Sequence, residues 1–456
     1  MPPSPYVIHL QAVGGIDCIA GGDSRRSVGP GSVLQPPDQC NAACGATMAG
    51  PAKPLQCSDL DSPSSVVAQL PRLMYHTRNP AEEGTVPAQQ PRFQPHIQPH
   101  IQSAEYARRL SRCRDALVEN GLDCLLLLPG INFTYLTGLR YARERYRLLA
   151  AVVTRQGALA VMGAAFEAAG LASGPVAAEV LTWRDDEDQY RRLASWIEYR
   201  CGARCHLALE PTTNFYHLRA LQTALPMVQI HDATPVTDDL RAVKSTAEIA
   251  CLQAAAACTR DRLVGVPELL TEGMTERELA TRFGRGAMIQ FGLSTASPNA
   301  VTGSRVLREG DTIVIDAGDR VEGYRSDLTR TFWFGEPSPR QREIYGIVNE
   351  AARAAIDAVR PGAPVEFVDL AARQVIGKAG YGEFFTHRGG HGLGLDFHEL
   401  PICVRGNKQP LVPGMVLTVE PGIYLPGEFG VRLEDDLLVT ETGNELLVER
   451  GPLYLE

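Results

Sequence analysis

The sequence predicts an α/β domain followed by a larger α+β domain, with a long segment of irregular composition before them. Three observations support this prediction. Strand-like and helix-like patterns alternate between residues 103 and 237, as in α/β layers. Helical patterns, strands and glycine-rich turns occupy residues 238–456. The first hundred residues hold 15 of the 32 prolines and keep no regular period, so we expect residues 1–102 to be a mostly disordered low-complexity tail.

The composition is that of a globular protein with a sizeable core. Hydrophobic residues make up 44% of the 456 residues, and charged residues make up 21%. The net charge of −9 argues against nucleic-acid binding and against a polybasic membrane anchor. No apolar stretch reaches the roughly 18 residues of a membrane span. We see no secretory signal, and the 11 scattered cysteines form no disulfide framework. We therefore expect a cytoplasmic protein that contacts neither membrane nor nucleic acid.

The α/β domain, residues 103–237, can be divided into elements in chain order. An apolar stripe at helical spacing predicts a helix over 104–120, ended by Asn120-Gly121. Another helical pattern covers 185–199. Apolar runs predict four buried strands, at 122–128, 148–153, 158–162 and 207–210. The segment 235–244 is the expected joint to the second domain.

The second domain, residues 238–456, begins with helical patterns. We predict helices over 246–263 and 276–289, then strands and turns as far as Trp333. Two more helices are expected over 340–359 and 365–379, with strands and turns from there to the end.

Two acidic residues lie in one predicted hairpin of this domain. The apolar run 312–315 ends in Asp316, and a return strand follows that contains Asp327. A turn centred on Val321-Glu322 would place the two acids directly opposite each other, with their β-carbons about 5 Å apart. Carboxylates that close repel each other unless a proton or a cation lies between them.

A second predicted hairpin carries another acidic pair. Glu420 follows the apolar run 415–419, and Glu434 ends the partner strand 430–434. The two acids are symmetric about Gly427, so they can also face each other. Between the two hairpins, a glycine-rich segment contains three of the ten histidines, which are His387, His391 and His398.

Four carboxylates and an imidazole form a hard, oxygen-rich ligand set. One divalent ion would neutralise this set only partly, so we expect two ions, most readily Mn²⁺, with Co²⁺, Zn²⁺ or Fe²⁺ as alternatives. Two such ions about 3.5–4 Å apart share a hydroxide, lower its pKa and polarise a carbonyl. The expected reaction is therefore hydrolysis.

The acids and histidines occur in motifs that resemble a known family. The motifs are IDAG at 315–318, SDLTRTF at 326–332, HRGGHGLGLDFHELP at 387–401, VEPGIY at 419–424 and GVRLEDD at 430–436. In this order and spacing they resemble the pita-bread metallopeptidases, which include Xaa-Pro dipeptidases (prolidases), Xaa-Pro aminopeptidases, methionine aminopeptidases and metal-free creatinases. YLTG at 135–138 and RAVKS at 241–245 resemble the creatinase-type N-terminal domain of the Xaa-Pro branch. The resemblance implies an α+β pita-bread catalytic domain over 238–456 and an α/β creatinase-type domain over 103–237.

The resemblance also implies roles for individual residues. The implied metal ligands are Asp316, Asp327, His391, Glu420 and Glu434. Asp327 and Glu434 would bridge both ions, and Glu420 would also act as general base toward the bridging water. His398 would contact the substrate and stabilise the tetrahedral intermediate. His387 is placed like a proton shuttle, and Arg432 would orient Glu434 or a neighbouring acid. The expected substrate-facing residues are Asn299, His398 and Arg432.

One position departs from the family pattern. Asn299 stands where the family has a substrate-facing histidine. An asparagine forms hydrogen bonds but carries no proton at neutral pH. Loss of general-acid help would lower turnover by ~10²-fold. In the alternative, Asn299 serves adequately as a hydrogen-bond partner, or water supplies the proton.

The expected function is metal-dependent hydrolysis of the Xaa-Pro bond at the N-terminus of dipeptides or short peptides. This bond is a tertiary amide without an N–H, and a site that holds the amino terminus and the scissile carbonyl does not require one. Dipeptidase and aminopeptidase remain open. Two other functions also remain open, namely a diverged amidohydrolase acting on a non-peptide amide and a weakly active or inactive binding protein. The resemblance further implies a homodimer, with peptides as substrates.

Overall fold

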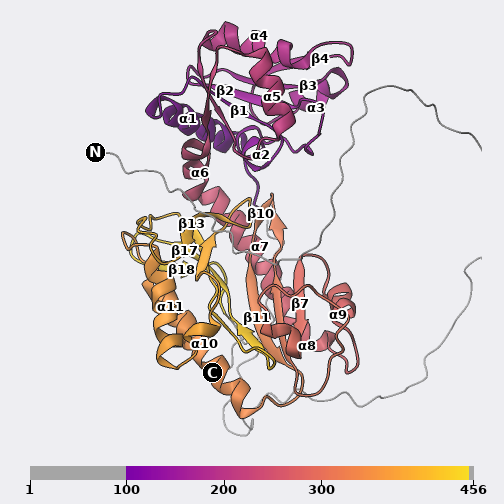
Figure 1. The fold of residues 1–456 in the computed structure, drawn as a ribbon, viewed down its shortest axis with the longest axis vertical. Coiled ribbons are helices and arrows are strands. Elements are labelled where there is room, and N and C mark those ends of the chain that lie inside the picture. Colours follow the sequence, from indigo (N-terminus) through magenta and orange to yellow (C-terminus); the bar gives the residue numbers. More distant parts are fainter. Residues whose placement is uncertain (1–98, 451–456) are drawn as a thin grey trace, which may run out of the picture. The chain divides into compact units, whose positions relative to one another are not determined.

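The computed structural model describes residues 99–450 (Figure 1). The predicted tail lies outside the described residues up to position 98. Of its last positions, Ile101 is described and only 2% exposed. It packs against Cys251 and Leu252 of helix α7 (Thr246–Val264). Packed structure therefore begins before the predicted domain start at residue 103.

The N-terminal domain is built on a six-stranded mixed sheet in the order β4-β3-β2-β1-β5-β6 (Figure 1). Strand β1 runs antiparallel to β2 and parallel to β5. The strands are β1 (Cys124–Leu127), β2 (Ala150–Thr154), β3 (Leu159–Ala164), β4 (Glu179–Trp183), β5 (His206–Leu209) and β6 (Gln229–Asp232). The helices are α1 (Ser103–Glu119), α2 (Ile131–Thr137), α3 (Ala168–Ala172), α4 (Gln189–Cys201), α5 (Phe215–Ala224) and α6 (Thr234–Ala242).

Strand β1 shows why this part of the sequence is a continuous apolar run. Successive side chains of a strand point to opposite faces of the sheet. Leu126 lies in an apolar cluster with Trp196 of α4, whereas Leu125 lies in another cluster with Leu117 of α1. Helices therefore cover both faces of the sheet, and no position of β1 needs to be polar.

The C-terminal domain contains two larger sheets and two short ribbons. The first sheet has the order β11-β8-β7 and the second the order β13-β12-β14-β17-β18, while β9 pairs with β10 and β15 with β16. The strands are β7 (Ala287–Phe291), β8 (Thr312–Ala317), β9 (Arg320–Val321), β10 (Tyr324–Arg325), β11 (Leu328–Trp333), β12 (Gly390–Gly392), β13 (Glu399–Cys403), β14 (Val416–Val419), β15 (Gly422–Tyr424), β16 (Gly430–Arg432), β17 (Asp435–Val439) and β18 (Asn444–Leu446). The helices besides α7 are α8 (Val266–Leu269), α9 (Glu276–Phe283), α10 (Pro339–Ala358) and α11 (Glu366–Lys378).

Two predicted elements differ from the structure. The helix predicted over 276–289 ends at Phe283, and β7 follows. Gly284 and Gly286 have φ angles of +101° and +79°, which a helix does not contain and which glycine adopts without strain. The predicted joint at 235–244 is mostly helix α6, with its proline in the first turn, where proline needs no hydrogen-bond partner.

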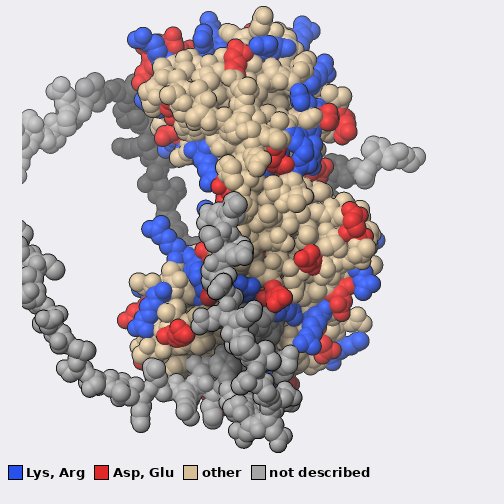
Figure 2. Space-filling model, turned by 180° about the vertical axis from the view of Figure 1, so that it is seen from behind, with Lys and Arg blue, Asp and Glu red and all other residues tan. Residues whose placement is uncertain are grey.

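The surface carries both signs of charge. Figure 2 shows basic and acidic side chains interspersed over the face in view. Among the described residues, no helix is both long enough and apolar enough to span a bilayer.

Candidate metal centre

A cavity of about 440 Å³ in the C-terminal domain is lined by all nine residues that the sequence assigned to the site. They are Asn299, Asp316, Asp327, His387, His391, His398, Glu420, Arg432 and Glu434. Pro298 and Arg388 complete the lining. Segments more than a hundred residues apart in the chain, from Asn299 to Glu434, thus meet in one place.

The first acidic pair is held by a hairpin whose register differs from the prediction. Asp316 is paired with Thr329, not with Asp327. The turn is formed by Glu322 and Gly323, with φ angles of +53° and +91°, so it lies one residue later than predicted. When the turn shifts by one residue, the residue paired with Asp316 changes by two positions, from Asp327 to Thr329. Because side chains alternate between the two faces of a strand, both acids stay on the same face. Asp327 is therefore the diagonal neighbour of Asp316.

The second acidic pair has the register that the sequence predicted. Gly422 pairs with Arg432 in the β15–β16 ribbon, and Val419 pairs with Asp435 between β14 and β17. Both pairings are symmetric about Gly427, so Glu420 and Glu434 lie opposite each other where the chain passes from one ladder to the next.

His391 is carried by the short central strand β12. The glycines on either side lie very close to the neighbouring strands. A β-carbon on Gly390 would lie 2.0 Å from the carbonyl oxygen of Thr418, and one on Gly392 would lie 2.1 Å from that of Leu400. Only glycine fits at these two positions, so the tight packing fixes the direction in which the imidazole points.

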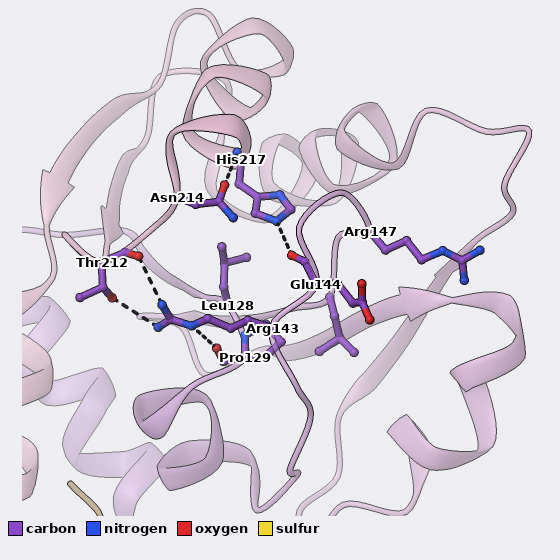
Figure 3. A pocket seen from close by; sticks show the side chains of 9 residues that line it. Leu128, Pro129, Arg143, Glu144, Arg147, Thr212, Asn214 and His217 are labelled. Atoms are coloured by element: carbon purple, nitrogen blue, oxygen red, sulfur yellow. Dashed lines mark hydrogen bonds between the residues drawn. The ribbon is translucent and has the colours of Figure 1, made fainter. Parts of the chain in front are cut away.

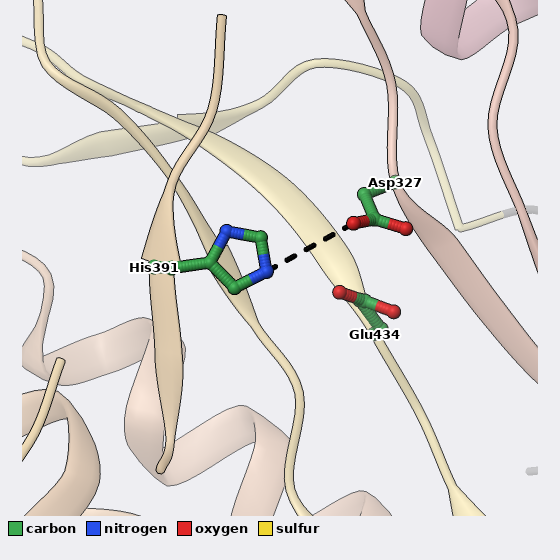
Figure 4. A group of neighbouring side chains, drawn as sticks. All are labelled: Asp327, His391 and Glu434. Atoms are coloured by element: carbon green, nitrogen blue, oxygen red, sulfur yellow. Dashed lines mark ion pairs between the residues drawn. The ribbon is translucent and has the colours of Figure 1, made fainter. Parts of the chain in front are cut away.

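Three of the five expected ligands form a compact buried group (Figure 4). One ligand atom each from Asp327, His391 and Glu434 lie within 4.8 Å of one another. His391 Nε2 is 3.9 Å from Asp327 Oδ2 and 3.5 Å from Glu420 Oε1. Among the described residues, no other such group of three was found.

Burial and mutual repulsion disfavour the charged forms of these carboxyl groups. Burial and then the Asp316 carboxylate raise the pKa of Asp327 well above its ordinary value. Burial and then Asp327 do the same to the pKa of Glu434. Burial raises the pKa of Glu420 to about 7. A cluster of acids that cannot all be ionised without a counter-charge suits a binding site for divalent cations.

Burial disfavours the charged forms of the histidines in the cavity. Burial lowers the pKa of His391 to about 4, and a neutral imidazole is the form that binds metal. Its Nδ1 lies 3.1 Å from the carbonyl oxygen of Gly392, which leaves Nε2 toward the acids. Burial also lowers the pKa of His387 to about 4, and its Nε2 lies 2.8 Å from the Tyr424 hydroxyl. The His398 ring meets His391 edge-on, with centroids 4.4 Å apart.

Arg432 connects the two hairpins. Its Nη2 donates to Asp316 Oδ2 at 2.7 Å, and its Nε donates to Thr329 Oγ1 at 3.1 Å. The Thr329 hydroxyl in turn donates to Glu434 Oε2 at 2.6 Å. Arg432 was predicted to orient Glu434 or a neighbouring acid. In the structure it contacts the neighbouring acid, Asp316, directly and reaches Glu434 through Thr329.

Comparison with known proteins identifies the family of this chain. Residues 109–243 match the Creatinase/Prolidase N-terminal domain, and residues 250–441 match Metallopeptidase family M24. The probable dipeptidase PepE of Mycobacterium tuberculosis is 38% identical over 353 residues, which are 74% of this chain and 93% of that protein. The chain belongs to metallopeptidase family M24. The family predicted from the motifs is thus confirmed.

Solved structures of M24 proteins have the same fold. Dipeptidase PepE from Mycobacterium ulcerans superposes with a TM-score of 0.72 at 37% identity, over 77% of this chain and 97% of that one. A prolidase from Thermococcus sibiricus superposes with a TM-score of 0.71 at 34% identity, over 75% and 97% of the two chains. The predicted fold, a pita-bread domain preceded by a creatinase-type domain, is confirmed by these matches.

Sequence reasoning missed three residues of this M24 site. Tyr424 stands two strand positions beyond Gly422 and four beyond Glu420, so the alternation of strand β15 could have placed it on the same face. Thr329 lies two residues after Asp327 and was open to the same argument. Arg388 adjoins His387, but no pattern in the sequence shows that its side chain reaches the cavity.

A second, smaller cavity lies in the N-terminal domain of this M24 chain (Figure 3). Two of its polar side chains, Arg143 and His217, have hydrogen-bond partners. Arg143 donates to the carbonyl oxygen of Pro129 at 2.6 Å and to Thr212. His217 lies 2.7 Å from the Tyr190 hydroxyl through Nδ1. Because both side chains are bonded to neighbouring residues of the domain, we assign this cavity to the scaffold, and the acidic cavity is the candidate active site.

Proposed function

We propose that this M24 peptidase hydrolyses the Xaa-Pro bond of dipeptides. The observation that carries the proposal is the convergence of four carboxylates and a neutral imidazole in one cavity. The names of the relatives support the substrate, since they include a dipeptidase, a prolidase and the Xaa-Pro dipeptidase from Bacillus anthracis.

The residues proposed to hold two divalent ions are Asp316, Asp327, His391, Glu420 and Glu434. The crowded carboxylates support this assignment, because their raised pKa values reflect a missing counter-charge. Oxygen-rich ligands favour Mn²⁺, with Co²⁺, Zn²⁺ or Fe²⁺ as alternatives. When bound, such ions supply a nucleophilic hydroxide at neutral pH and polarise the scissile carbonyl.

The other residues act on protons and on orientation. Glu420 is proposed as the general base that takes a proton from the attacking water. His398 faces the cavity beside His391 and would donate a hydrogen bond to the developing oxyanion. His387 and the Tyr424 hydroxyl, 2.8 Å apart, form a path along which a proton can move. Arg432 keeps Asp316 in place.

Arg388 supports a dipeptide over a longer peptide. Its side chain lines the cavity. Burial and then the charge of Arg388 lower the pKa of His398. Within residues 99–450, its guanidinium has no hydrogen bond or ion pair, whereas Arg432 is paired with Asp316. A guanidinium without a protein partner can bind the α-carboxylate of the proline in an Xaa-Pro dipeptide.

The experiment that tests the function compares Ala-Pro with Ala-Pro-Ala after reconstitution with Mn²⁺. We expect metal-dependent cleavage of Ala-Pro and little cleavage of the tripeptide. Cleavage of Ala-Pro-Ala at an equal rate would instead assign an Xaa-Pro aminopeptidase. Bound metal without either activity would favour an amidohydrolase that acts on a non-peptide amide, and absence of metal binding would contradict every hydrolase proposal.

Asn299 favours a second candidate, a weakly active or inactive binding protein. The asparagine is exposed in the cavity wall, where the family has a histidine. Its loop is held by Arg432, which donates to the carbonyl oxygen of Pro298 at 3.2 Å. If the missing histidine limits turnover, Asn299→His raises kcat for Ala-Pro. An unchanged or lower kcat would show that this substitution is not the limiting defect.

The proposal includes a cytoplasmic homodimer. In such a dimer the N-terminal domain of one subunit approaches the active site of the other. Size-exclusion chromatography with light scattering tests this point, because a mass of one chain would contradict it.

A further inference from the structure

We propose that Glu399, held by two cations at the junction of the domains, positions the loop that carries His398. Glu399 is the first residue of β13 and directly follows His398. The inference rests on the proposed function only for its kinetic test, since its other readout is independent of activity.

The junction of the domains supplies the cations. Lys244 Nζ lies 3.3 Å from Glu399 Oε2, and Arg241 Nε lies 3.7 Å from Oε1. The side chains of Lys244 and Glu399 are 1% and 2% exposed. Arg241 belongs to the last turn of α6, and Lys244 immediately precedes the capping serine of α7. The carboxylate is therefore fixed by the short segment that connects one domain to the other.

The other side of the same carboxylate faces the loop. Glu399 Oε1 accepts a hydrogen bond from the backbone N–H of Asp396 at 3.0 Å. A β-carbon on Gly394 would lie 2.4 Å from Glu399 Oε2, so the loop passes as close to the carboxylate as a backbone can. Residues 394–399 thus form a loop around the buried Glu399 carboxylate, and His398 is part of this loop.

The charge state of the group is consistent with this role. Burial alone would raise the pKa of Glu399, but the cations Lys244 and Arg241 lower it below its ordinary value. The anion therefore persists at neutral pH. A buried ion pair adds little net stability compared with apolar packing. Its consequence here is geometric, because one carboxylate accepts hydrogen bonds from the Asp396 N–H and from Lys244 Nζ and lies 3.7 Å from Arg241 Nε.

This arrangement makes Glu399 and Lys244 positioning residues for His398. Neither lines the cavity, so neither touches the substrate. A small displacement of a group that stabilises the transition state costs up to ~10²-fold in rate. We therefore expect Glu399→Gln and Lys244→Met each to lower kcat for Ala-Pro by ~10-fold or more, with a smaller change in KM and unchanged metal content.

Hydrogen–deuterium exchange of residues 393–400 provides the test that does not depend on activity. Both variants should exchange faster in this loop, while Lys244→Arg, which keeps the charge, should resemble the wild type. Glu210→Gln is the matched control, since it alters another buried carboxylate, hydrogen-bonded to Asn132 in the N-terminal domain. The control should leave exchange of the loop and kcat unchanged.

A combined substitution decides whether the effect passes through His398. In a His398→Ala background, Glu399→Gln should change kcat by less than ~2-fold, because residues in one network are not additive. A full, multiplicative loss in that background would overturn the proposal, as would wild-type exchange of the loop in both single variants. If a single variant fails to fold, Lys244→Met/Glu399→Gln removes both charges of the more deeply buried pair, so that only the partly exposed Arg241 loses a partner. If the wild type cleaves no Xaa-Pro substrate, the proposed function fails, and exchange still decides the role of Glu399.

Discussion

Polar side chains are treated in opposite ways in the small cavity of the N-terminal domain and in the acidic cavity. In the N-terminal domain, Arg143 and His217 are each surrounded by partners of complementary chemistry. In the catalytic domain, Asp327 and Glu434 face other acids, and the pKa of each is raised because burial and like charges disfavour ionisation. The comparison shows that unsatisfied charge, rather than the presence of polar residues, distinguishes the functional cavity from the structural one.

The largest effect expected from this difference follows from Asp327→Asn. The substitution removes one of three closely grouped ligand atoms, so we expect loss of bound metal and hydrolysis of Ala-Pro at background level. Asp319→Asn is the matched control, because Asp319 belongs to the same hairpin but pairs with Arg262 outside the cavity. Metal analysis and kinetics on both variants check the prediction, and normal turnover by Asp327→Asn would remove this residue from the site.

Arg432→Met should have the next largest effect. It deletes the hydrogen bonds to Asp316 and Thr329 while the five expected ligands stay in place. Loss of a residue that orients a ligand typically costs about 10–100-fold in metal affinity or activity. Titration with Mn²⁺ and measurement of kcat/KM test this expectation. An Arg262→Met variant removes a comparable ion pair elsewhere and should change neither value.

When metal is removed, the melting temperature should fall as the pH rises, because the buried carboxyl groups of the site then ionise. The pKa of Glu420 rises from an unfolded value of 4.5 to about 7 in the folded protein. Folding therefore favours the protonated form of Glu420. This contribution to the free energy of unfolding is fully present below about pH 4.5 and is lost as the pH rises through 7. We expect the chelated protein to melt at a lower temperature at pH 8 than at pH 5, and Mn²⁺ to reverse this at pH 8. A melting temperature that rises with pH in the chelated protein would contradict the raised pKa values.

The smallest effect is expected in the N-terminal cavity, and it has the opposite sign. Burial lowers the pKa of His217 below 6.5, so the neutral form is favoured in the fold. The stability that His217 contributes is present above pH 6.5 and is lost as the pH falls through its folded pKa. With Mn²⁺ present, so that the acids of the metal site do not contribute, the urea midpoint of wild type followed by tryptophan fluorescence should fall between pH 7 and pH 5. His217→Asn should weaken this dependence, and an unchanged slope would show that His217 does not cause it.

The sequence was sufficient wherever a local pattern determines the geometry. The register of the second hairpin followed from its symmetry about Gly427, and β1 followed from an apolar run between turn residues. The predicted register of the first hairpin was wrong because its turn lies one residue later than predicted. The residue type of Glu322 did not indicate that it has a positive φ angle. The helix over 276–289 was wrong because Gly284 and Gly286 permit a turn inside an otherwise helical pattern.

Contacts between distant segments could not be predicted in the same way. The hydrogen bond from Arg432 to Asp316 joins residues 116 positions apart, and the one from Lys244 to Glu399 joins residues 155 positions apart. No periodicity connects such residues, since the fold of the whole domain brings them together. Motif resemblance identified Arg432 as an orienting residue, whereas Glu399 belongs to a motif but has partners that only the coordinates show.

The glycines on either side of His391 also limit how this enzyme can change. Because neighbouring carbonyl oxygens occupy the space that any side chain at Gly390 or Gly392 would need, the strand cannot be used to alter the floor of the cavity. New substrate preferences, whether natural or engineered, have to arise at other lining positions, such as Asn299, whose side chain is exposed, and Arg388. A library that randomises those two positions and leaves the glycines untouched would therefore sample selectivity without loss of the metal-binding framework.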